Sequence, residues 1–406
     1  MKTENYTLKN GIRLVHKHVE SPIAHCGILI NTGSRDELPE EHGLAHLVEH
    51  LLFKGTTNRK AYHVLSRMED VGAEINAYTT KEETCIHQSF FKQYYERALE
   101  LMSDILLHST FPEKEIEKEK EVIIDEINSY RDSPSELIFD EFEEWIFKNN
   151  PIGRNILGSE ETLKNITRTD ILKFLQANYF TNEMVISSVG DIAFNKLIRL
   201  AEKYFGAMEP KIAGKKSVNK IDYIPFNRQV NKNTYQVHCL VGNEAYDIRN
   251  EKRYALYLLN NLLGGPGLNS RLNMTLREKK GFAYNVDSNY TAYSDTGVIN
   301  IYFGADVKDL KKSINSVISE LDKIKNRPLG QLQLARAKKQ LTGQIAISSE
   351  NNENLMLSMA KSILLYNRVD TLEETESKIE SITSKSLQDV ANEIFNTKDL
   401  SYLIYL

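Results

Sequence analysis

Few features of the sequence assign it to a specialised class of protein. It has three cysteines, Cys26, Cys85 and Cys239, in 406 residues. They are too few and too far apart for a disulfide framework, and none has the Cys-x-x-Cys spacing of a metal site. Each lies in an apolar, strand-like stretch, so we expect buried free thiols in a reducing compartment. We likewise assign His87, near Cys85, to a strand rather than to a metal site.

The chain also lacks a strong excess of charge and a long apolar run. Its 51 Lys and Arg residues against 56 Asp and Glu residues give a net charge of −5. This balance does not favour binding to nucleic acid. No stretch approaches the roughly 18 apolar residues that cross a bilayer, and no apolar signal-peptide core follows Met1. We therefore expect a cytoplasmic protein with neither nucleic-acid nor membrane partners.

What is present is typical of a globular protein with more than one domain. Hydrophobic residues make up 41% of the chain and charged residues 26%, and 406 residues are too many for one ordinary core. Gly214, Pro225 and several lysines mark residues 211–226 as a linker between an N-terminal domain, 1–210, and a C-terminal domain, 227–406.

Strand-like and helix-like patterns alternate in both halves. Gly264–Gly267 follows a helical pattern rather than a strand, so we interpret it as a turn and not as a phosphate-binding loop. In chain order the predicted elements are a hairpin turning at Asn10–Gly11, a strand at 26–30, a helix over the motif described next, a helix at 60–70, strands at 73–79 and 84–90, helical structure over 92–149, a helix at 168–178, a strand at 184–190, a helix at 194–205, a strand at 234–242, helices at 250–263 and 270–279, strands at 283–292 and 297–304, helices to 396, and a strand at 400–406.

One helix of the first half carries the residues with the clearest chemical meaning, His46-Leu47-Val48-Glu49-His50. Histidines at i and i+4 point the same way, so both can reach one metal ion. The spacing H-x-x-E-H is the inverted form of the zinc-protease motif. Glu49 is placed to take a proton from a water molecule at the metal.

The alternative is an ordinary solvated helix face, and the rest of the helix argues against it. A solvated face normally carries Lys or Arg, yet neither occurs between Gly43 and Phe53. The histidines and Glu49 fall away from one apolar stripe with helical spacing. That stripe consists of Leu44, Leu47, Val48, Leu51 and Leu52.

A catalytic zinc needs a third protein ligand and one open position. Residues 112–132 form a helix candidate in which Glu119 and Glu126 lie seven residues apart, within about 20° on one face. One carboxylate could bind the metal and the other could orient a ligand. Most charges of this helix fit a solvated surface, and composition does not say which Glu is the ligand.

Four blocks around these residues resemble the pitrilysin family of inverted zinc metallopeptidases, which includes insulin-degrading enzyme and the mitochondrial processing peptidase. The blocks are GSRDE at 33–37, GLAH at 43–46, FKGT at 53–56 and EKEVIIDEI at 119–127. The resemblance implies one Zn²⁺ per chain, held by His46, His50 and Glu126, with Glu119 as a supporting carboxylate. Mn²⁺ or Co²⁺ could replace zinc in vitro.

The resemblance continues through residues 151–158, Tyr179 and 189–191. In the second half, NSRL at 269–272 and LREKKGFAY at 276–284 fit a further family block. That block implies that Arg277 and Tyr284 contact substrate near the zinc. The implied fold class is α+β, with two homologous halves, each a mostly antiparallel sheet covered by helices. The second half lacks H-x-x-E-H, so only the first would hold the metal.

Residues 71–79 resemble the family's active-site edge strand, which binds peptide by adding a strand to the sheet. Asn76 and Ala77 would then line the substrate; otherwise Asn76 is a polar residue on the outer face of an ordinary strand.

The implied function is a zinc metalloendopeptidase that hydrolyses peptides or unfolded segments inside a clamshell chamber, with Glu49 as the general base. Half-size family members pair two chains. Because this chain carries both the zinc set and Arg277 with Tyr284, we expect a homodimer in which that pair acts in trans. The alternative is a noncatalytic scaffold or core subunit of the same fold. Such scaffolds usually lose part of the motif, whereas every expected position is filled here.

Overall fold

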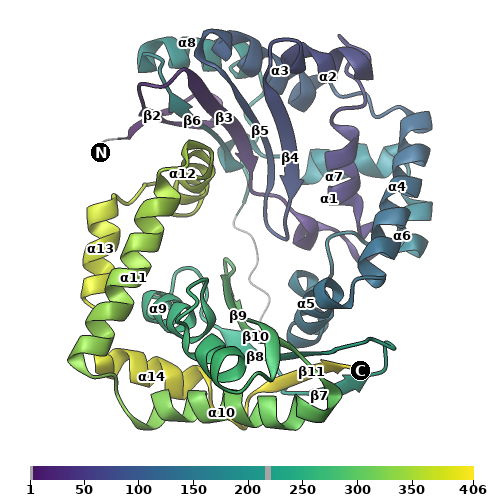
Figure 1. Ribbon diagram of the computed structural model, residues 1–406. Helices are drawn as coiled ribbons and strands as arrows, with labels where there is room; N and C mark the ends of the chain where they lie inside the picture. Colours follow the sequence, from purple (N-terminus) through teal and green to yellow (C-terminus); the bar gives the residue numbers. More distant parts are fainter. Residues whose placement is uncertain (1–2, 215–220) are drawn as a thin grey trace. The chain divides into compact units, whose positions relative to one another are not determined.

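The computed structural model describes residues 3–214 and 221–406, which form two compact units (Figure 1). The first unit comprises Met1–Ile127, Arg154–Ser217 and Ile347–Thr371. The second comprises Asn128–Gly153, Val218–Ala346 and Leu372–Leu406. Each unit is built on one β-sheet with its own hydrophobic core.

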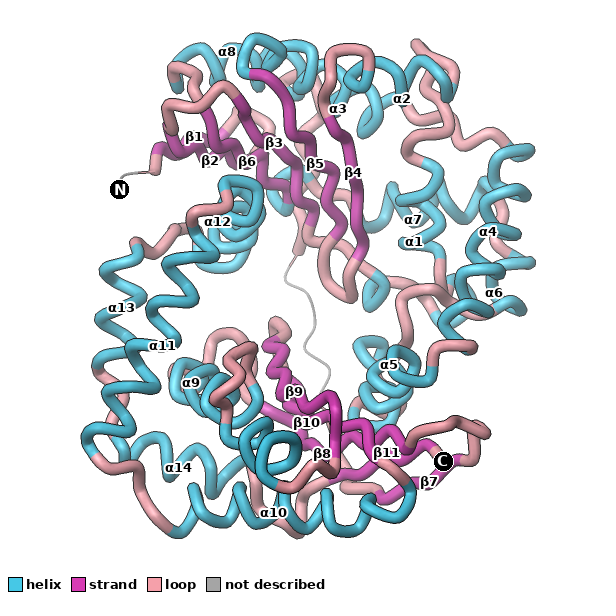
Figure 2. Tube along the Cα trace, viewed as in Figure 1, coloured by secondary structure: helices cyan, strands magenta, loops and turns pink. Residues whose placement is uncertain are grey.

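The sheet of the first unit has six strands in the order β1-β2-β6-β3-β5-β4. Only β2 and β6 pair in parallel, and the remaining neighbours are antiparallel. Every residue of β6 is buried, because helices cover both faces of the sheet (Figure 2). The strands are β1 Glu4–Thr7, β2 Arg13–His18, β3 Ile23–Ile30, β4 Glu74–Thr79, β5 Thr84–Phe91 and β6 Met184–Gly190.

The two faces of this sheet receive helices from different parts of the chain. Most of the helices pack on one face and share its main core. The other face is covered by α12, Asn352–Tyr366, whose Met356, Met359 and Ile363 pack on it. The Ser187 hydroxyl of β6 donates to the backbone carbonyl of Met356 at 2.7 Å. The helices of the first face are α1 Leu44–Leu51, α2 Ala61–Glu69, α3 Tyr95–His108, α4 Glu113–Arg131, α6 Glu160–Asn165, α7 Arg168–Asn178 and α8 Phe194–Phe205.

The sheet of the second unit has five strands in the order β7-β11-β8-β10-β9, of which only β7 and β11 pair in parallel. One face packs against α9, α10 and α14. The other face receives Phe142 and Ile146 of α5, Pro134–Ile146. The remaining bounds are β7 Asn227–Val230, β8 Val237–Ala245, β9 Ala283–Ala292, β10 Gly297–Ala305, β11 Ser401–Tyr405, α9 Arg253–Gly264, α10 Leu310–Asn326, α11 Gln331–Ser349, α13 Leu372–Glu380 and α14 Ser384–Ile394.

The two sheets repeat one topology. Without β1, the first sheet has the order β2-β6-β3-β5-β4, and the second has the order β7-β11-β8-β10-β9. When the five strands of each half are numbered along the chain, both orders read 1-5-2-4-3. The first and fifth strands are the parallel pair in both sheets. The structure therefore confirms the predicted α+β class with two mostly antiparallel sheets, each covered by helices.

The continuous ranges 1–210 and 227–406 do not coincide with the two compact units, because the halves exchange a helix. Helix α5 belongs to the second unit, and α12 belongs to the first. An apolar stripe shows that a helix has a buried side but not which sheet it covers. Of the predicted linker, 211–226, residues 215–220 lie outside the described part.

The predicted elements are found close to their expected positions. The helical stretch at 92–149 is divided into α3, α4 and α5, with Pro112 just before α4 and Pro134 as the first residue of α5. The predicted turn at Asn10–Gly11 joins β1 to β2, and Gly11 has a φ of +98°, which favours glycine. The helix predicted at 270–279 contains a π-helix, Asn273–Lys279.

The three cysteines are buried and free, as predicted. Burial raises the pKa of the Cys26 thiol to about 12. Among the described residues we find no helix with the length and apolar character needed to span a membrane.

Candidate metal centre

Helix α1 separates the residues that fold it from the residues that carry its chemistry. Leu44, Leu47, Val48 and Leu51 are all buried in the core of the first unit. His46 is 8% exposed, and Glu49 and His50 are half-buried. The polar side of α1 is therefore sheltered rather than solvated, and the alternative of an ordinary surface helix does not describe it.

The start of α1 is fixed by a glycine and by a buried carboxyl group. Gly43 has a φ of +97°, and a Cβ there would meet the Leu157 carbonyl oxygen at 2.7 Å. The backbone N–H groups of Gly43 and Ala45 donate to Glu37 Oε2 and Oε1 at 3.0 and 2.8 Å. Glu37 is only 4% exposed. It satisfies N–H groups that have no partner within the helix, and it thereby sets the position from which His46 and His50 project.

His46, His50 and Glu126 converge on one point. Glu126 Oε2 lies 3.9 Å from His46 Nε2 and 3.8 Å from His50 Nε2. One ligand atom from each residue lies within 4.8 Å of the others, and among the described residues no other group of His, Cys and carboxylates does so. Zinc bonds of about 2.0–2.2 Å in a tetrahedron require ligand atoms roughly 3.4 Å apart. The three residues therefore fit a metal ion after a small contraction.

The histidines differ in what holds their second nitrogen. His50 Nδ1 lies 3.2 Å from Glu119 Oε2, a position that suits the supporting carboxylate implied by the resemblance, although that role stays a prediction. The other carboxylate oxygen of Glu119 pairs with Lys54 Nζ at 2.7 Å. His46 Nδ1 is buried and has no hydrogen-bond partner among the described residues. A carboxylate behind a ligating imidazole fixes its tautomer and raises its basicity.

Burial shifts the pKa values of two residues of α1, His46 and Glu49. It lowers the pKa of His46 to about 4, with the neighbouring His50 acting in the same direction. His46 is therefore neutral at pH 7, which is the form that binds metal. Burial also raises the pKa of Glu49; Glu126 adds to this effect and His50 opposes it.

Asn76 and Ala77 lie on β4, the edge strand beside α1. Ala77 packs toward the helical core of the first unit, and Asn76 is exposed. In the described part of the chain β4 pairs only with β5, so it forms one edge of the sheet. This geometry suits the predicted peptide-binding strand, although the assignment of these two residues stays a prediction.

Arg277 and Tyr284 belong to the second unit. Arg277 lies on the π-helix, and its side chain is half exposed, 3.6 Å from Glu278. Tyr284, near the start of β9, is 74% exposed. π-Helical turns are rare and often occur at functional sites, which is consistent with a functional role for this block. The contact of these residues with substrate stays a prediction.

Two residues that support the centre had no assigned role from the sequence, Glu37 and Lys54. Both lie inside blocks that carry the resemblance, GSRDE and FKGT. Glu37 accepts hydrogen bonds from backbone N–H groups, and Lys54 pairs with a carboxylate 65 residues away. A pattern of residue types in the sequence identifies neither contact.

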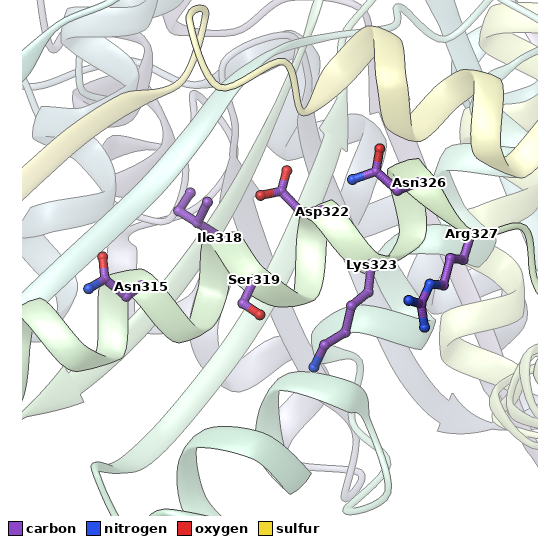
Figure 3. A pocket seen from close by; sticks show the side chains of 7 residues that line it. All are labelled: Asn315, Ile318, Ser319, Asp322, Lys323, Asn326 and Arg327. Carbon is purple, nitrogen blue, oxygen red and sulfur yellow. The ribbon is translucent and has the colours of Figure 1, made fainter.

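A shallow depression elsewhere lies along α10 (Figure 3), and it is not part of this centre. None of its lining residues is a predicted site residue, and none is a histidine or cysteine. They are Asn315, Ile318, Ser319, Asp322, Lys323, Asn326 and Arg327.

The sequence matches two family models that together span most of the chain. Residues 13–160 match the insulinase domain of peptidase family M16, and residues 165–341 match the inactive domain of the same family. An uncharacterized zinc protease of Bacillus subtilis, YmxG, is 32% identical over 97% of this chain and 95% of its own length. One from Streptomyces coelicolor is 30% identical over 97% of this chain and 87% of its own length.

Solved structures show the same fold. A protease from Helicobacter pylori superposes with a TM-score of 0.91 at 23% identity, covering 100% of this chain and 99% of its own. A peptidase M16 inactive domain from Pseudomonas fluorescens gives a TM-score of 0.92 at 18% identity, with coverage of 100% and 98%. With H-x-x-E-H and its Glu126 partner in the first unit and no second such centre among the described residues, the chain belongs to the insulinase family of metallopeptidases, peptidase family M16.

Proposed function

We propose that the protein is a zinc-dependent endopeptidase that cleaves peptides or unfolded polypeptide segments. The observation that carries this proposal is the convergence of His46, His50 and Glu126 beside Glu49. Two imidazoles and a carboxylate are a catalytic zinc set that leaves one position open. The names of the relatives, zinc proteases, support the same activity.

When bound, zinc supplies a Lewis acid that polarises the scissile carbonyl and makes a water molecule more acidic. Glu49 would take a proton from the attacking water and later deliver it to the leaving amine. His46, His50 and Glu126 would hold the ion, and Glu119 would keep the imidazole of His50 oriented.

Substrate would add as a strand to the open edge of β4, where backbone pairing reads an extended shape rather than a sequence. Asn76 is exposed on that strand and available to a polar contact. Arg277 would hold substrate backbone or a carboxylate, and the Tyr284 hydroxyl would stabilise the oxyanion. Tyr284 is 74% exposed, and Arg277 is half exposed beside Glu278, so substrate could reach both side chains.

We further propose a cytoplasmic homodimer with two equivalent sites, in which Arg277 and Tyr284 of one chain serve the zinc of the other. The chain retains both the metal set and this pair, which supports equivalent sites. Mixing Glu49→Gln chains with Tyr284→Phe chains should restore activity, because one of the mixed sites then has both groups intact. If the mixture is no more active than either variant alone, action in trans is wrong.

The activity itself is tested with the purified protein and a library of unstructured peptides. Peptide cleavage should require zinc, stop on chelation and return when zinc is added back. Glu49→Gln should retain zinc and lose about 10²–10⁴-fold in kcat, because it removes the general base. Glu121→Gln is the matched control, since Glu121 is exposed on α4 and should leave activity unchanged. Bound zinc without cleavage of any peptide would instead favour the noncatalytic scaffold.

A further inference from the structure

We propose that Lys54 is a positioning residue of the metal centre, acting through Glu119 to hold His50 ready for zinc. Its ammonium group, the Glu119 carboxylate and the His50 imidazole form one continuous chain of contacts. Lys54 Nζ lies 2.7 Å from Glu119 Oε1, and His50 Nδ1 lies 3.2 Å from Glu119 Oε2. The inference rests on the proposed zinc site and adds a residue that touches neither metal nor substrate.

The position of Lys54 is set by the same helix that carries His50. Lys54 follows α1, and its backbone N–H donates to the Leu51 carbonyl at 3.1 Å. Glu119 comes from α4, which lies beside α1 (Figure 1). The carboxylate therefore bridges two points of one helix end, His50 and Lys54. This leaves Glu119 little freedom to turn away from the imidazole.

Because the Glu119 carboxylate is buried, its contact with the Lys54 ammonium group stabilises its charge. The Glu119 side chain is 9% exposed and that of Lys54 is 29% exposed. A carboxylate so far removed from water needs a compensating charge, and the His50 ring uses only one of its oxygens. Lys54 supplies the charge at the other oxygen. With Oε2 thus directed at Nδ1–H, the Nε2 lone pair of His50 is free for the metal.

His46 provides an internal contrast. Its Nδ1 has no partner among the described residues, so nothing comparable orients its ring from behind. Packing holds His46, whereas a carboxylate and a lysine hold His50. Loss of Lys54 should therefore weaken the metal centre at the His50 ligand.

The test is the zinc dissociation constant, measured by competition with a chromophoric chelator, together with thermal unfolding of the metal-free protein. Lys54→Met should weaken zinc binding about 10–100-fold, the range for loss of a partner behind a ligand. Lys54→Arg, which keeps the positive charge, should recover most of the affinity. Lys118→Met is the matched control: Lys118 lies on α4 next to Glu119, is 55% exposed and pairs only with Glu115 among the described residues. It should bind zinc like the wild type.

A double-mutant cycle separates positioning through Glu119 from a general effect on the fold. If Lys54 acts through Glu119, Lys54→Met should cost little further affinity once Glu119→Gln is present. Equal losses in both backgrounds, or Lys54→Met binding zinc within about twofold of Lys118→Met, would overturn the inference. A wild-type protein that binds no zinc would overturn the proposed function with it, whereas tight binding unchanged by Lys54→Met would overturn only the role of Lys54.

Discussion

The two units build the same five-strand pattern but differ in the helix that follows the second strand of that pattern. In the first unit this helix is α1, which follows β3, and in the second it is α9, which follows β8. Both bury an apolar stripe, made in α9 of Leu256, Leu259 and Leu263. Yet α9 has neither histidine nor carboxylate along its length.

The difference separates fold from chemistry. The shared stripe is what each sheet needs to be covered, so it recurs in both units. His46, Glu49 and His50 lie outside that stripe and have no counterpart in α9. A single fold can thus hold a reactive centre in one copy and none in the other, because function depends on the site and not on the architecture.

The comparison also predicts where the exchanged helices contribute stability. Met356 of α12 is fully buried in the first unit, and Phe142 of α5 is fully buried in the second. Met356→Ala and Phe142→Ala should each cost about 2–5 kcal/mol, because each leaves a cavity. Hydrogen exchange should increase in β3 and β6 for Met356→Ala, and in β8 and β10 for Phe142→Ala. The reverse pattern of exchange would contradict the assignment of these helices to the two sheets.

A pH-dependent effect distinguishes the starts of α1 and α9. Burial raises the pKa of Glu37, which binds the start of α1, from 4.5 to about 8. Between those values the folded state keeps a proton that the unfolded state has lost. Stability should therefore fall as pH rises from about 5 to 8, by at most about 1.4 kcal/mol per pH unit, and the contribution is gone above pH 8.

Glu37→Gln should remove this dependence. The free energy of unfolding would be measured in urea at several pH values for the wild type and for Glu37→Gln, with chelator present to exclude metal effects. The difference between the two proteins should change with pH. Parallel curves for the two proteins would show that Glu37 does not titrate in this way. At the start of α9 the backbone N–H of Lys252 donates instead to Asn250 Oδ1 at 2.9 Å, an amide oxygen that does not titrate.

Much of the architecture could be predicted from the sequence, because periodicity records which side of each element is buried. The strands, the motif helix and the pairing of His46 with His50 follow from spacing alone. Glu126 could be chosen over Glu119 only through the family resemblance, since both lie on one face of α4. The exchange of α5 and α12 and the pairing of Lys54 with Glu119 depend on contacts between distant segments. The role of Glu37 depends on backbone N–H groups six and eight residues later, which a pattern of side-chain types does not identify.

The most direct test of this account is to give α1 the chemistry of α9 while leaving its apolar stripe intact. Zinc content and unfolding would be measured for the wild type and for a chain carrying His46→Gln and His50→Gln. We expect about one zinc per chain in the wild type and none in the variant, and metal-free forms that unfold within about 1 kcal/mol of each other. A variant that keeps its zinc, or whose metal-free form no longer folds, would contradict the separation of fold from chemistry in α1.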